Sequence, residues 1–162
     1  RLGAAPIVNA HVAYDRQVLD EPFFAGVDTP VQWVFDRTAQ SGYTGGQYLA
    51  VSMSAADPIV DTPVAGIRDL IVPALARLLP AARRAQVRDF FVTRERQATF
   101  RPAPGTASLR PPPGTALPGL FLAGAWTATG WPATMEGAVR SGNAAAAAVL
   151  GSRTSLERAC AP

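Results

Sequence analysis

The residues whose types and spacing best suit chemistry lie between Gly119 and Gly142, where a short apolar run, a loop rich in Gly and Thr, and a helical pattern follow one another. The apolar run 120–123 predicts a buried parallel strand that ends at Gly124, where a ligand can approach the backbone closely. The helix that follows directs unpaired N–H groups and its positive dipole end back towards the strand tip. Such a helix start suits an anion or an electron-rich carbonyl.

The first turn of that helix supplies the donors of the predicted site. The backbone N–H groups near Thr134, Met135 and Glu136 are positioned for an electron-rich ligand. Gly137 and Ala138 keep the turn thin, so that helix and ligand can pack closely. Strand–glycine–helix units also occur in α/β proteins that bind nothing there, and on the pattern alone we prefer that simpler interpretation.

Few other residues offer chemistry. Cys160 is the only cysteine and His11 the only histidine, so we expect no internal disulfide and no metal site. The net charge is +3, but the basic residues are all Arg and are scattered from Arg16 to Arg158, which does not indicate a nucleic-acid surface. No uninterrupted apolar stretch reaches the length of about 20 residues that a membrane span needs. A weak attraction to anionic lipid stays open.

The elements that must position these residues form an α+β arrangement, an antiparallel sheet with one helix that precedes the strand–loop–helix unit. Alternation of apolar and polar residues predicts an antiparallel meander of short strands at 6–15, 31–37 and 47–54, and a further strand at 87–93 that continues towards Phe100.

Prolines mark the ends of the remaining elements. We expect a helix with Thr62 as N-cap and Pro63 at its first position, a kink at Pro73 and an end at Pro80. A Pro-rich connection at 101–118 is expected to be extended and exposed. The last residues, 151–162, show no pattern and are expected to be loose.

The amino-acid identities in this segment are more specific than its pattern of apolar and polar positions. From Leu120, LFLAGAWTATGWPATMEGAVRSG resembles the closing FAD motif of the flavin amine oxidase and phytoene desaturase superfamily. NAHVAYDR, QWVFDR, GGQYLAVSMSAAD and RERQATFRPAPG precede it in the order found in the squalene-associated FAD-dependent desaturases, the hydroxysqualene dehydroxylases of hopanoid biosynthesis. The resemblance covers most of the chain.

This resemblance implies part of a two-domain flavoprotein: residues 1–118 from the substrate-binding domain, 119–150 from the C-terminal piece of a Rossmann-like FAD domain, and a tail. The GxGxxG of the dinucleotide-binding half is absent, because Gly42, Gly45 and Gly46 do not fit its spacing. The implied cofactor is FAD, and the implied FAD-binding residues are Gly124, Ala125, Trp126, Trp131, Pro132, Thr134, Met135, Glu136, Gly137 and Ala138.

One position departs from the family pattern. Many relatives carry an acidic residue directly after the glycine of the motif, where a carboxylate would bind the ribityl chain, and this sequence has Ala125. A backbone group or a water would have to make that contact.

The implied reaction is reductive dehydroxylation of hydroxysqualene to squalene, with an apolar polyprenyl substrate in a dry tunnel. Trp33 and Phe35 are the substrate-lining candidates, although alternate strand residues are more often core, and Trp126 and Trp131 are candidates to cover the flavin. His11 is interpreted as a satisfied strand histidine and Glu136 as a first-turn carboxylate. No residue is assigned as the catalytic proton donor.

Two alternatives stay open. The first is another flavoenzyme of the superfamily, such as a carotenoid desaturase or an amine oxidase. The second is a truncated, non-catalytic module that does not bind FAD by itself, favoured by the missing GxGxxG and by Ala125. We expect the parent enzyme in the cytoplasm, with peripheral contact at the inner face of the membrane; no feature indicates its oligomeric state.

Overall fold

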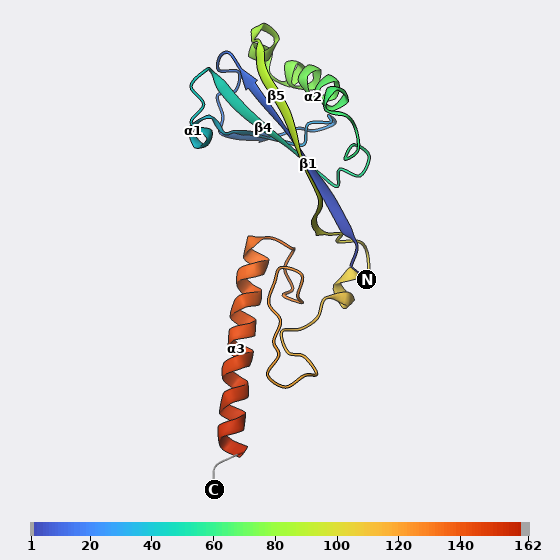
Figure 1. Ribbon diagram of the computed structural model, residues 1–162, viewed down its shortest axis with the longest axis vertical. Helices are drawn as coiled ribbons and strands as arrows, with labels where there is room; N and C mark the ends of the chain where they lie inside the picture. The colour runs from blue at the N-terminus through green and yellow to red at the C-terminus, as the bar shows by residue number, and fades with distance from the viewer. Residues whose placement is uncertain (1, 160–162) are drawn as a thin grey trace. The chain divides into compact units, whose positions relative to one another are not determined.

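The computed structural model describes the backbone of residues 2–159 and the side chains of residues 2–152. It divides into two compact units, one formed by Ala5–Ala98 and the other by the described residues before and after that range. The first unit contains the sheet, and the second contains the long C-terminal helix (Figure 1). The assignment of 1–118 and 119–150 to substrate and FAD domains stays a prediction.

The first unit is built on a five-stranded sheet. Its strands are β1 (Ala4–Tyr14), β2 (Phe23–Ala25), β3 (Trp33–Asp36), β4 (Gln47–Ser54) and β5 (Val87–Phe100). The order is β2-β3-β4-β1-β5, and the pairs β2–β3, β3–β4 and β1–β4 are antiparallel. The expected strands at 6–15, 31–37 and 47–54 are thus present, and the expected fourth strand does continue to Phe100.

The expected order of the strands is wrong. A meander would place 31–37 between 6–15 and 47–54, but β4 lies between β1 and β3. The turn at Gly42–Gly46 folds β4 back on β3, while β1 pairs with the free edge of β4 from Ile7↔Ser54 to Tyr14↔Gln47. Consecutive strands tend to lie side by side, but here β1 pairs with β4, which comes later in the chain after a longer connection.

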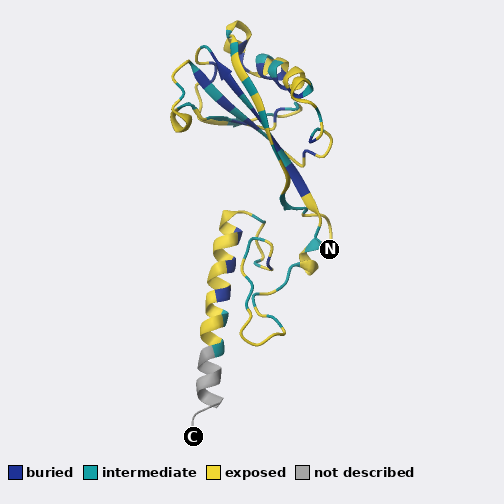
Figure 2. Ribbon diagram, in the orientation of Figure 1, coloured by how far each residue is buried: buried dark blue, intermediate teal, exposed yellow. Residues whose placement is uncertain are grey.

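One face of the sheet is the core. Residues in β1 and β4 alternate between buried and half-buried, as period-2 strands do, and the buried stripe is visible along both strands (Figure 2). Val8, Val12, Leu49 and Val51 belong to this buried cluster together with Ile67, Ile71 and Leu75 of α2 (Val64–Leu78). The helical spacing of those three residues is what turns one stripe of α2 to the sheet.

The start of α2 differs from the expectation. The helix begins at Val64, with Pro63 in the N-cap position and no side-chain cap, so Thr62 does not serve as N-cap. The carbonyl of Thr62 instead accepts a hydrogen bond from Arg94 Nη2 at 2.6 Å. Pro73 lies inside the helix, and Pro80 opens the 3-10 turn η1 (Pro80–Arg84) that follows its end.

Two short elements were not expected from the sequence: β2 and α1 (Thr38–Ser41). Neither is long enough to display a period. The α1 turn begins where Asp36 accepts hydrogen bonds from the Thr38 N–H and hydroxyl groups, at 2.8 and 2.5 Å, and ends at Gly42 with φ 69°. Glycine readily adopts the left-handed backbone conformation that this position requires.

The second unit contains η2 (Thr106–Leu109), irregular loops and α3 (Met135–Ala159). The expected parallel strand at 120–123 is not formed; Phe121 makes a single antiparallel bridge to Gly114, and Leu120 is 46% exposed. A parallel strand needs neighbours to satisfy its backbone groups, and the described residues of this unit provide none.

The Pro-rich connection is less extended than expected and is hydrogen-bonded to the loop that follows it. It contains η2, and two of its prolines accept hydrogen bonds from the following loop: Pro113 from the Leu122 N–H and Pro111 from the Ala128 N–H, both at 2.8 Å. The expectation of a loose tail from residue 151 is wrong for residues 151–159, which continue α3. Cys160 lies outside the described residues.

Candidate functional site

The predicted site is a loop, 124–134, fastened to the first turns of α3. Ser141 of α3 accepts a hydrogen bond from the Gly124 N–H at 2.9 Å, and its hydroxyl lies 2.6 Å from that of Thr127. The Thr127 hydroxyl also donates to the Gly124 carbonyl at 3.0 Å. Thr127 and Ser141 are both buried, so this network is shielded from competing water and fixes where the loop begins.

Arg110 organises the rest of the loop. Its guanidinium donates to the carbonyl oxygens of Trp131 at 2.7 Å and Ala125 at 2.8 Å, and more weakly to that of Trp126 at 3.4 Å. It also lies 5.3 Å from the ring centroid of Phe100. Because the fork of one side chain holds both ends of 125–131, Arg110 sets the curvature of this segment.

The start of α3 has two unoccupied donors. Thr134 acts as N-cap through its hydroxyl, which accepts from the Gly137 N–H at 3.3 Å, and its carbonyl accepts from the Ala138 N–H at 3.0 Å. Within the described part of the chain, the N–H groups of Met135 and Glu136 have no acceptor. The Thr134 N–H was predicted to be a third donor, but it donates to the Pro132 carbonyl at 2.8 Å and is not available.

Two of the glycines of the motif, Gly124 and Gly137, make space for protein atoms. At Gly124, with φ 152°, a Cβ would lie 2.4 Å from Nε1 of Trp126, whose indole packs on this glycine. At Gly137 a Cβ would lie 2.4 Å from the carbonyl oxygen of Pro132. Close approach occurs at both positions, but the approaching groups are Trp126 and Pro132 and not the ligand that was predicted to approach there.

The remaining residues of the motif surround the helix start. Trp126 and Trp131 are 41% and 42% exposed, so both indoles have a free surface. The Arg140 guanidinium lies 4.2 Å from the ring centroid of Trp131 and pairs with Glu136, one turn earlier, at 2.7 Å. Glu136 thus has the predicted role of a first-turn carboxylate.

Ala125 contributes through its backbone. Its carbonyl is taken by Arg110, and its N–H has no acceptor among the described residues. That N–H can only donate a hydrogen bond, so it does not replace the acceptor that a carboxylate provides at this position in other sequences.

Next to this loop lies an open cavity of about 480 Å³. It is lined by Phe100, Arg110, Trp131, Pro132 and Ala133, among others. Arg110 is its charged group, but this side chain already donates to loop carbonyls, so the cavity wall presents mainly apolar surface.

In the first unit, Trp33 and Phe35 lie on the sheet face opposite the α2 core. Trp33 is 44% exposed and Phe35 is half-buried, and with Phe23 they form an aromatic cluster with ring centroids 6.1–6.4 Å apart. The interpretation as core is therefore wrong for these two residues. Their availability agrees with a substrate-lining role, which stays a prediction.

His11 lies on the same face, in β1. Its Nδ1 is 2.7 Å from the Tyr48 hydroxyl and its Nε2 is 3.2 Å from the Thr93 hydroxyl. Burial lowers the pKa of His11 below its ordinary value. The prediction of a satisfied, partly buried histidine agrees with these contacts.

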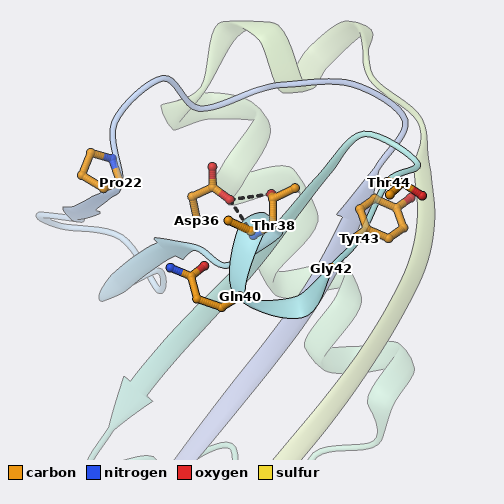
Figure 3. Close-up of a pocket in the computed structure, with 8 residues that line it drawn as sticks. Pro22, Asp36, Thr38, Gln40, Gly42, Tyr43 and Thr44 are labelled. Carbon is orange, nitrogen blue, oxygen red and sulfur yellow. Dashed lines mark hydrogen bonds between the residues drawn. The ribbon is translucent and has the colours of Figure 1, made fainter.

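A further cavity, of about 460 Å³, lies beside α1 and is lined by Pro22, Asp36, Thr38 and Tyr43 among others (Figure 3). Although burial acts to raise it, the pKa of Asp36 is held below its ordinary value by hydrogen bonds from Thr38 and Gln47. The carboxylate is thus saturated by internal donors, and we assign it a structural role in the turn.

Sequence reasoning missed Arg110 and the partners of His11. Arg110 stands in a Pro-rich segment without a periodic signal, and its acceptors lie 15 to 21 residues later. Tyr48 was recognised only as an alternating strand residue; its contact with His11 depends on the β1–β4 register, which no local pattern encodes.

The described residues form neither a candidate metal centre nor a membrane-spanning helix. They contain no group of three or more His, Cys, Asp or Glu side chains arranged to hold a metal ion. Among them, no helix combines the length and the apolar character needed to cross a bilayer.

Comparison with known proteins matches residues 1–150 to the family model of the flavin containing amine oxidoreductases. The chain is 39% identical over 142 residues to a hydroxysqualene dehydroxylase of Sinorhizobium fredii, covering 86% of this chain, and 36% identical over 144 residues to one of Rhodopseudomonas palustris, covering 89%. It spans 31% and 32% of the lengths of those two relatives. A zeta-carotene desaturase of Synechocystis sp. is 30% identical over 114 residues, 70% of this chain and 23% of the relative.

A similar fold occurs in a crystal structure assigned as a protoporphyrinogen oxidase from Exiguobacterium sp. 255-15. The TM-score is 0.63 at 13% sequence identity, and the match covers 91% of this chain and 34% of the other. The family match extends over nearly the whole chain and includes the loop and helix of the candidate site. The chain therefore belongs to the flavin containing amine oxidoreductase family, whose cofactor is FAD.

Proposed function

We propose that this chain forms the flavin-ring end of an FAD site in an oxidoreductase that acts on a polyprenyl hydrocarbon. The reaction proposed is the reductive dehydroxylation of hydroxysqualene to squalene, a step of hopanoid biosynthesis. The similarity to two hydroxysqualene dehydroxylases, at 39% and 36% identity, supports this choice of substrate.

The observation that carries the proposal is the pair of free backbone donors at Met135 and Glu136. A flavin that has accepted a hydride carries negative charge around N1 and the C2 carbonyl, and free N–H groups at the positive end of α3 stabilise that charge. Reduced FAD, when bound, supplies the hydride for the reaction. The donor set therefore fits this cofactor.

The other residues of the motif are proposed to position those donors. Thr134 caps the helix, and Gly137 allows Pro132 to pack against its first turn. Gly124 gives the Trp126 indole room to pack on the loop, and the small side chains of Ala125 and Ala138 are proposed to leave space for the ring. Trp126 and Trp131 are proposed to cover the ring.

The aromatic cluster on the sheet is proposed to contact the polyprenyl chain. Trp33, Phe35 and Phe23 present apolar rings on an uncovered sheet face of the first unit. Aromatic surface of this kind suits an unsaturated hydrocarbon without a charged group. We propose that the enzyme is cytoplasmic and takes this substrate through peripheral contact with the inner face of the membrane.

A second candidate is desaturation of a carotenoid precursor. It is favoured by the 30% identity to a zeta-carotene desaturase and would use the same apolar face for a longer hydrocarbon. The two reactions run in opposite redox directions, because dehydroxylation consumes a hydride that desaturation would give to the cofactor.

The test uses the full-length protein that contains this chain, purified with FAD and reduced without oxygen. Hydroxysqualene, zeta-carotene and phytoene are added separately; the two carotenoids are also given to the oxidised protein. Formation of squalene with reoxidation of the flavin is the expected result. Turnover of a carotenoid alone would reject the dehydroxylase proposal in favour of the second candidate.

A further inference from the structure

Arginines are concentrated at one end of the first unit. Four of the fifteen basic residues lie within the twelve residues from Arg77 to Arg88, and this stretch contains no acidic residue. Outside it, acidic residues outnumber basic ones by one, so the stretch accounts for the positive net charge of the chain. We call its four arginines, Arg77, Arg83, Arg84 and Arg88, the basic cluster.

The fold gathers the basic cluster at the tip of the unit. Arg77 belongs to the last turn of α2. Arg83 and Arg84 belong to η1, and Arg88 is the second residue of β5. η1 joins the end of α2 to the start of β5 at one end of the sheet (Figure 1), and the side chains of all four arginines are exposed there (Figure 2).

Two members of the basic cluster have no partner. Arg83 donates through Nε to the Ala76 carbonyl at 2.8 Å and so satisfies an acceptor in the last turn of α2. Among the described residues, the side chains of Arg77 and Arg84 make no hydrogen bond, ion pair or aromatic contact. The arginines of the first unit outside the cluster all make one: Arg16 with Asp15, Arg37 with Phe35, Arg68 with Phe90, Arg94 with Thr62 and Arg96 with Asp61.

The carboxylate beside the basic cluster is already neutralised by another arginine. Asp15 accepts from the Gln86 N–H at 2.9 Å, between η1 and β5, and pairs with Arg16 at 2.9 Å. The pKa of Asp15 is lowered to about 2, first by the hydrogen bond from Arg16 and also by the charge of Arg88. Asp15 therefore leaves an excess of positive charge at the tip of the unit.

Aliphatic residues lie between the arginines. Leu78 is 37% exposed, and Pro80 and Ala81 are exposed as well. The stretch 77–88 contains no aromatic residue of the kind that stacks on nucleic-acid bases. Guanidinium groups around exposed aliphatic residues suit the surface of a bilayer, where the cations meet headgroup phosphates and the aliphatic side chains enter the interface.

The same end of the sheet also carries a cavity. Its volume is about 460 Å³, and Ala13, Tyr48, Asp89 and Phe91 line it together with the loop at 41–44. Asp89 directly follows Arg88 in β5, and successive residues of a strand point to opposite faces, so the cavity and the basic cluster are neighbours at the start of this strand. A hydrocarbon that leaves a membrane at the basic cluster thus has apolar and aromatic surface close by.

We propose that the basic cluster docks this enzyme on the surface of a membrane that contains anionic phospholipids. The inference rests on the proposed function, because a polyprenyl substrate is dissolved in the bilayer and the enzyme must reach it there. Each arginine near an anionic surface strengthens binding by roughly fivefold. Arg77 and Arg84 can meet headgroup phosphates without first breaking a contact within the protein.

The experiment measures co-sedimentation of the full-length, flavin-loaded protein with vesicles. One set contains phosphatidylcholine alone, and the other contains equal amounts of phosphatidylcholine and phosphatidylglycerol. The wild type should bind the second set in preference to the first, and rising salt should weaken this binding. Arg77→Gln combined with Arg84→Gln should weaken it by roughly 25-fold, since two charges of about fivefold each are lost.

The matched control combines Arg77→Lys with Arg84→Lys, which keeps both charges and should bind the anionic vesicles as the wild type does. Arg96→Gln removes one charge from the far part of β5 and should change binding little. Equal binding by the Gln and Lys double variants would overturn the inference, as would equal binding of the wild type to both sets of vesicles. Binding to an RNA or DNA duplex without binding to anionic vesicles would also overturn it and would indicate a nucleic-acid partner.

A rate measurement separates this inference from the proposed function. Hydroxysqualene is supplied to the reduced protein in anionic vesicles and in neutral detergent micelles. The ratio of the first rate to the second should fall in the Gln double variant and stay at the wild-type value in the Lys double variant. Conversion with an unchanged ratio in the Gln double variant would overturn the inference and leave the proposed function intact. Binding to anionic vesicles that depends on the basic cluster, without conversion of hydroxysqualene, would reject the proposed function and support the docking surface.

Discussion

At the scale of single residues, Arg110 shows how one side chain determines the form of a loop that has no regular structure. The carbonyls of Ala125 and Trp131 both accept hydrogen bonds from one guanidinium, and the Thr129 hydroxyl adds only a longer contact of 3.3 Å to the Trp131 carbonyl. A Lys ammonium cannot reproduce two donors in a fixed planar fork. The geometry of the loop therefore depends on Arg at this position.

Arg110→Lys should loosen the loop without unfolding either unit. Each hydrogen bond to a charged donor contributes about 1.5–3 kcal/mol, so losing one of them should speed local amide exchange roughly tenfold or more. Hydrogen exchange of a peptide covering 124–131 in the full-length protein measures this. Arg96→Lys is the control, since Arg96 makes an exposed pair with Asp61 in the first unit and should leave the peptide unchanged. Unchanged exchange in Arg110→Lys would contradict the role assigned to Arg110.

Residue identities alone predicted some roles and missed others. Glu136 and Arg140 stand four residues apart in a helical pattern, so their pairing follows from local geometry. Arg110, Tyr48 and Thr93 act on residues distant in sequence, and only the folded chain brings these groups together. The exposed position of Trp33 and Phe35 was missed because alternation separates two faces of a strand but does not indicate which face is covered.

At the scale of elements, the start of α3 is proposed to contact the flavin ring through backbone groups. A backbone donor can be deleted by proline, which is well accommodated at the first position of a helix. Met135 occupies that position after the Thr134 cap. The chain thus allows one N–H to be removed with little change to the helix.

Met135→Pro should weaken binding of FAD by the full-length protein roughly tenfold, the effect of losing one hydrogen bond to a charged group. It should also lower the midpoint potential of the flavin, because the reduced form would lose a stabilising donor. Met135→Ala retains the N–H and is the matched control, since the Met135 side chain is 89% exposed. Equal affinities and potentials for the two variants would exclude this N–H as a flavin contact.

The junction between β1 and β5 should be sensitive to acid. The Asp15 carboxylate accepts from Arg16 and from the Gln86 N–H, at 2.9–3.0 Å, and these bonds lower the pKa of Asp15 from 3.8 to about 2. The folded state therefore holds this proton less tightly than the unfolded chain. The resulting stabilisation is present above pH 3.8 and is lost as the pH falls towards 2.

Asp15→Asn should therefore cost more stability at pH 7 than at pH 3. Urea unfolding of the full-length protein at both pH values measures the difference. Hydrogen exchange of peptides from β1 and β5 provides the local readout. Arg16→Gln removes the strongest of the contacts that lower the pKa of Asp15. It should therefore also reduce the pH dependence of the unfolding free energy. A cost for Asp15→Asn that is identical at the two pH values would contradict the assignment.

The elements also show where sequence patterns have predictive power. Strands of eight or more residues and α2 were predicted because their periods repeat often enough to be recognised. The order β3-β4-β1 was not, because it depends on which sheet edge the first strand joins. The apolar run at 120–123 has the composition of a buried strand, but a strand forms only beside others.

At the scale of the whole molecule, the two units differ in how far they cover their own apolar residues. The first unit has a continuous buried cluster shared by the sheet and α2. In the second unit the buried residues are few, including Thr127, Ser141 and Ala145, while α3 exposes Val139, Val149 and Leu150 at 59%, 39% and 64%. Hydrophobic burial is the main source of stability, so the first unit should be the more stable of the two.

The 162-residue chain on its own should therefore be colourless, and its two units should differ in their protection against amide hydrogen exchange. It carries two free donors at the helix start but no GxGxxG segment to hold the rest of a dinucleotide. Its visible spectrum after purification with excess FAD should lack flavin absorbance, whereas the full-length protein should be yellow. Amides of β1 and β4 should exchange more slowly than those of α3. Near-stoichiometric flavin in the isolated chain would show that the loop and α3 bind FAD without a dinucleotide-binding half, and the division of the site proposed above would be rejected.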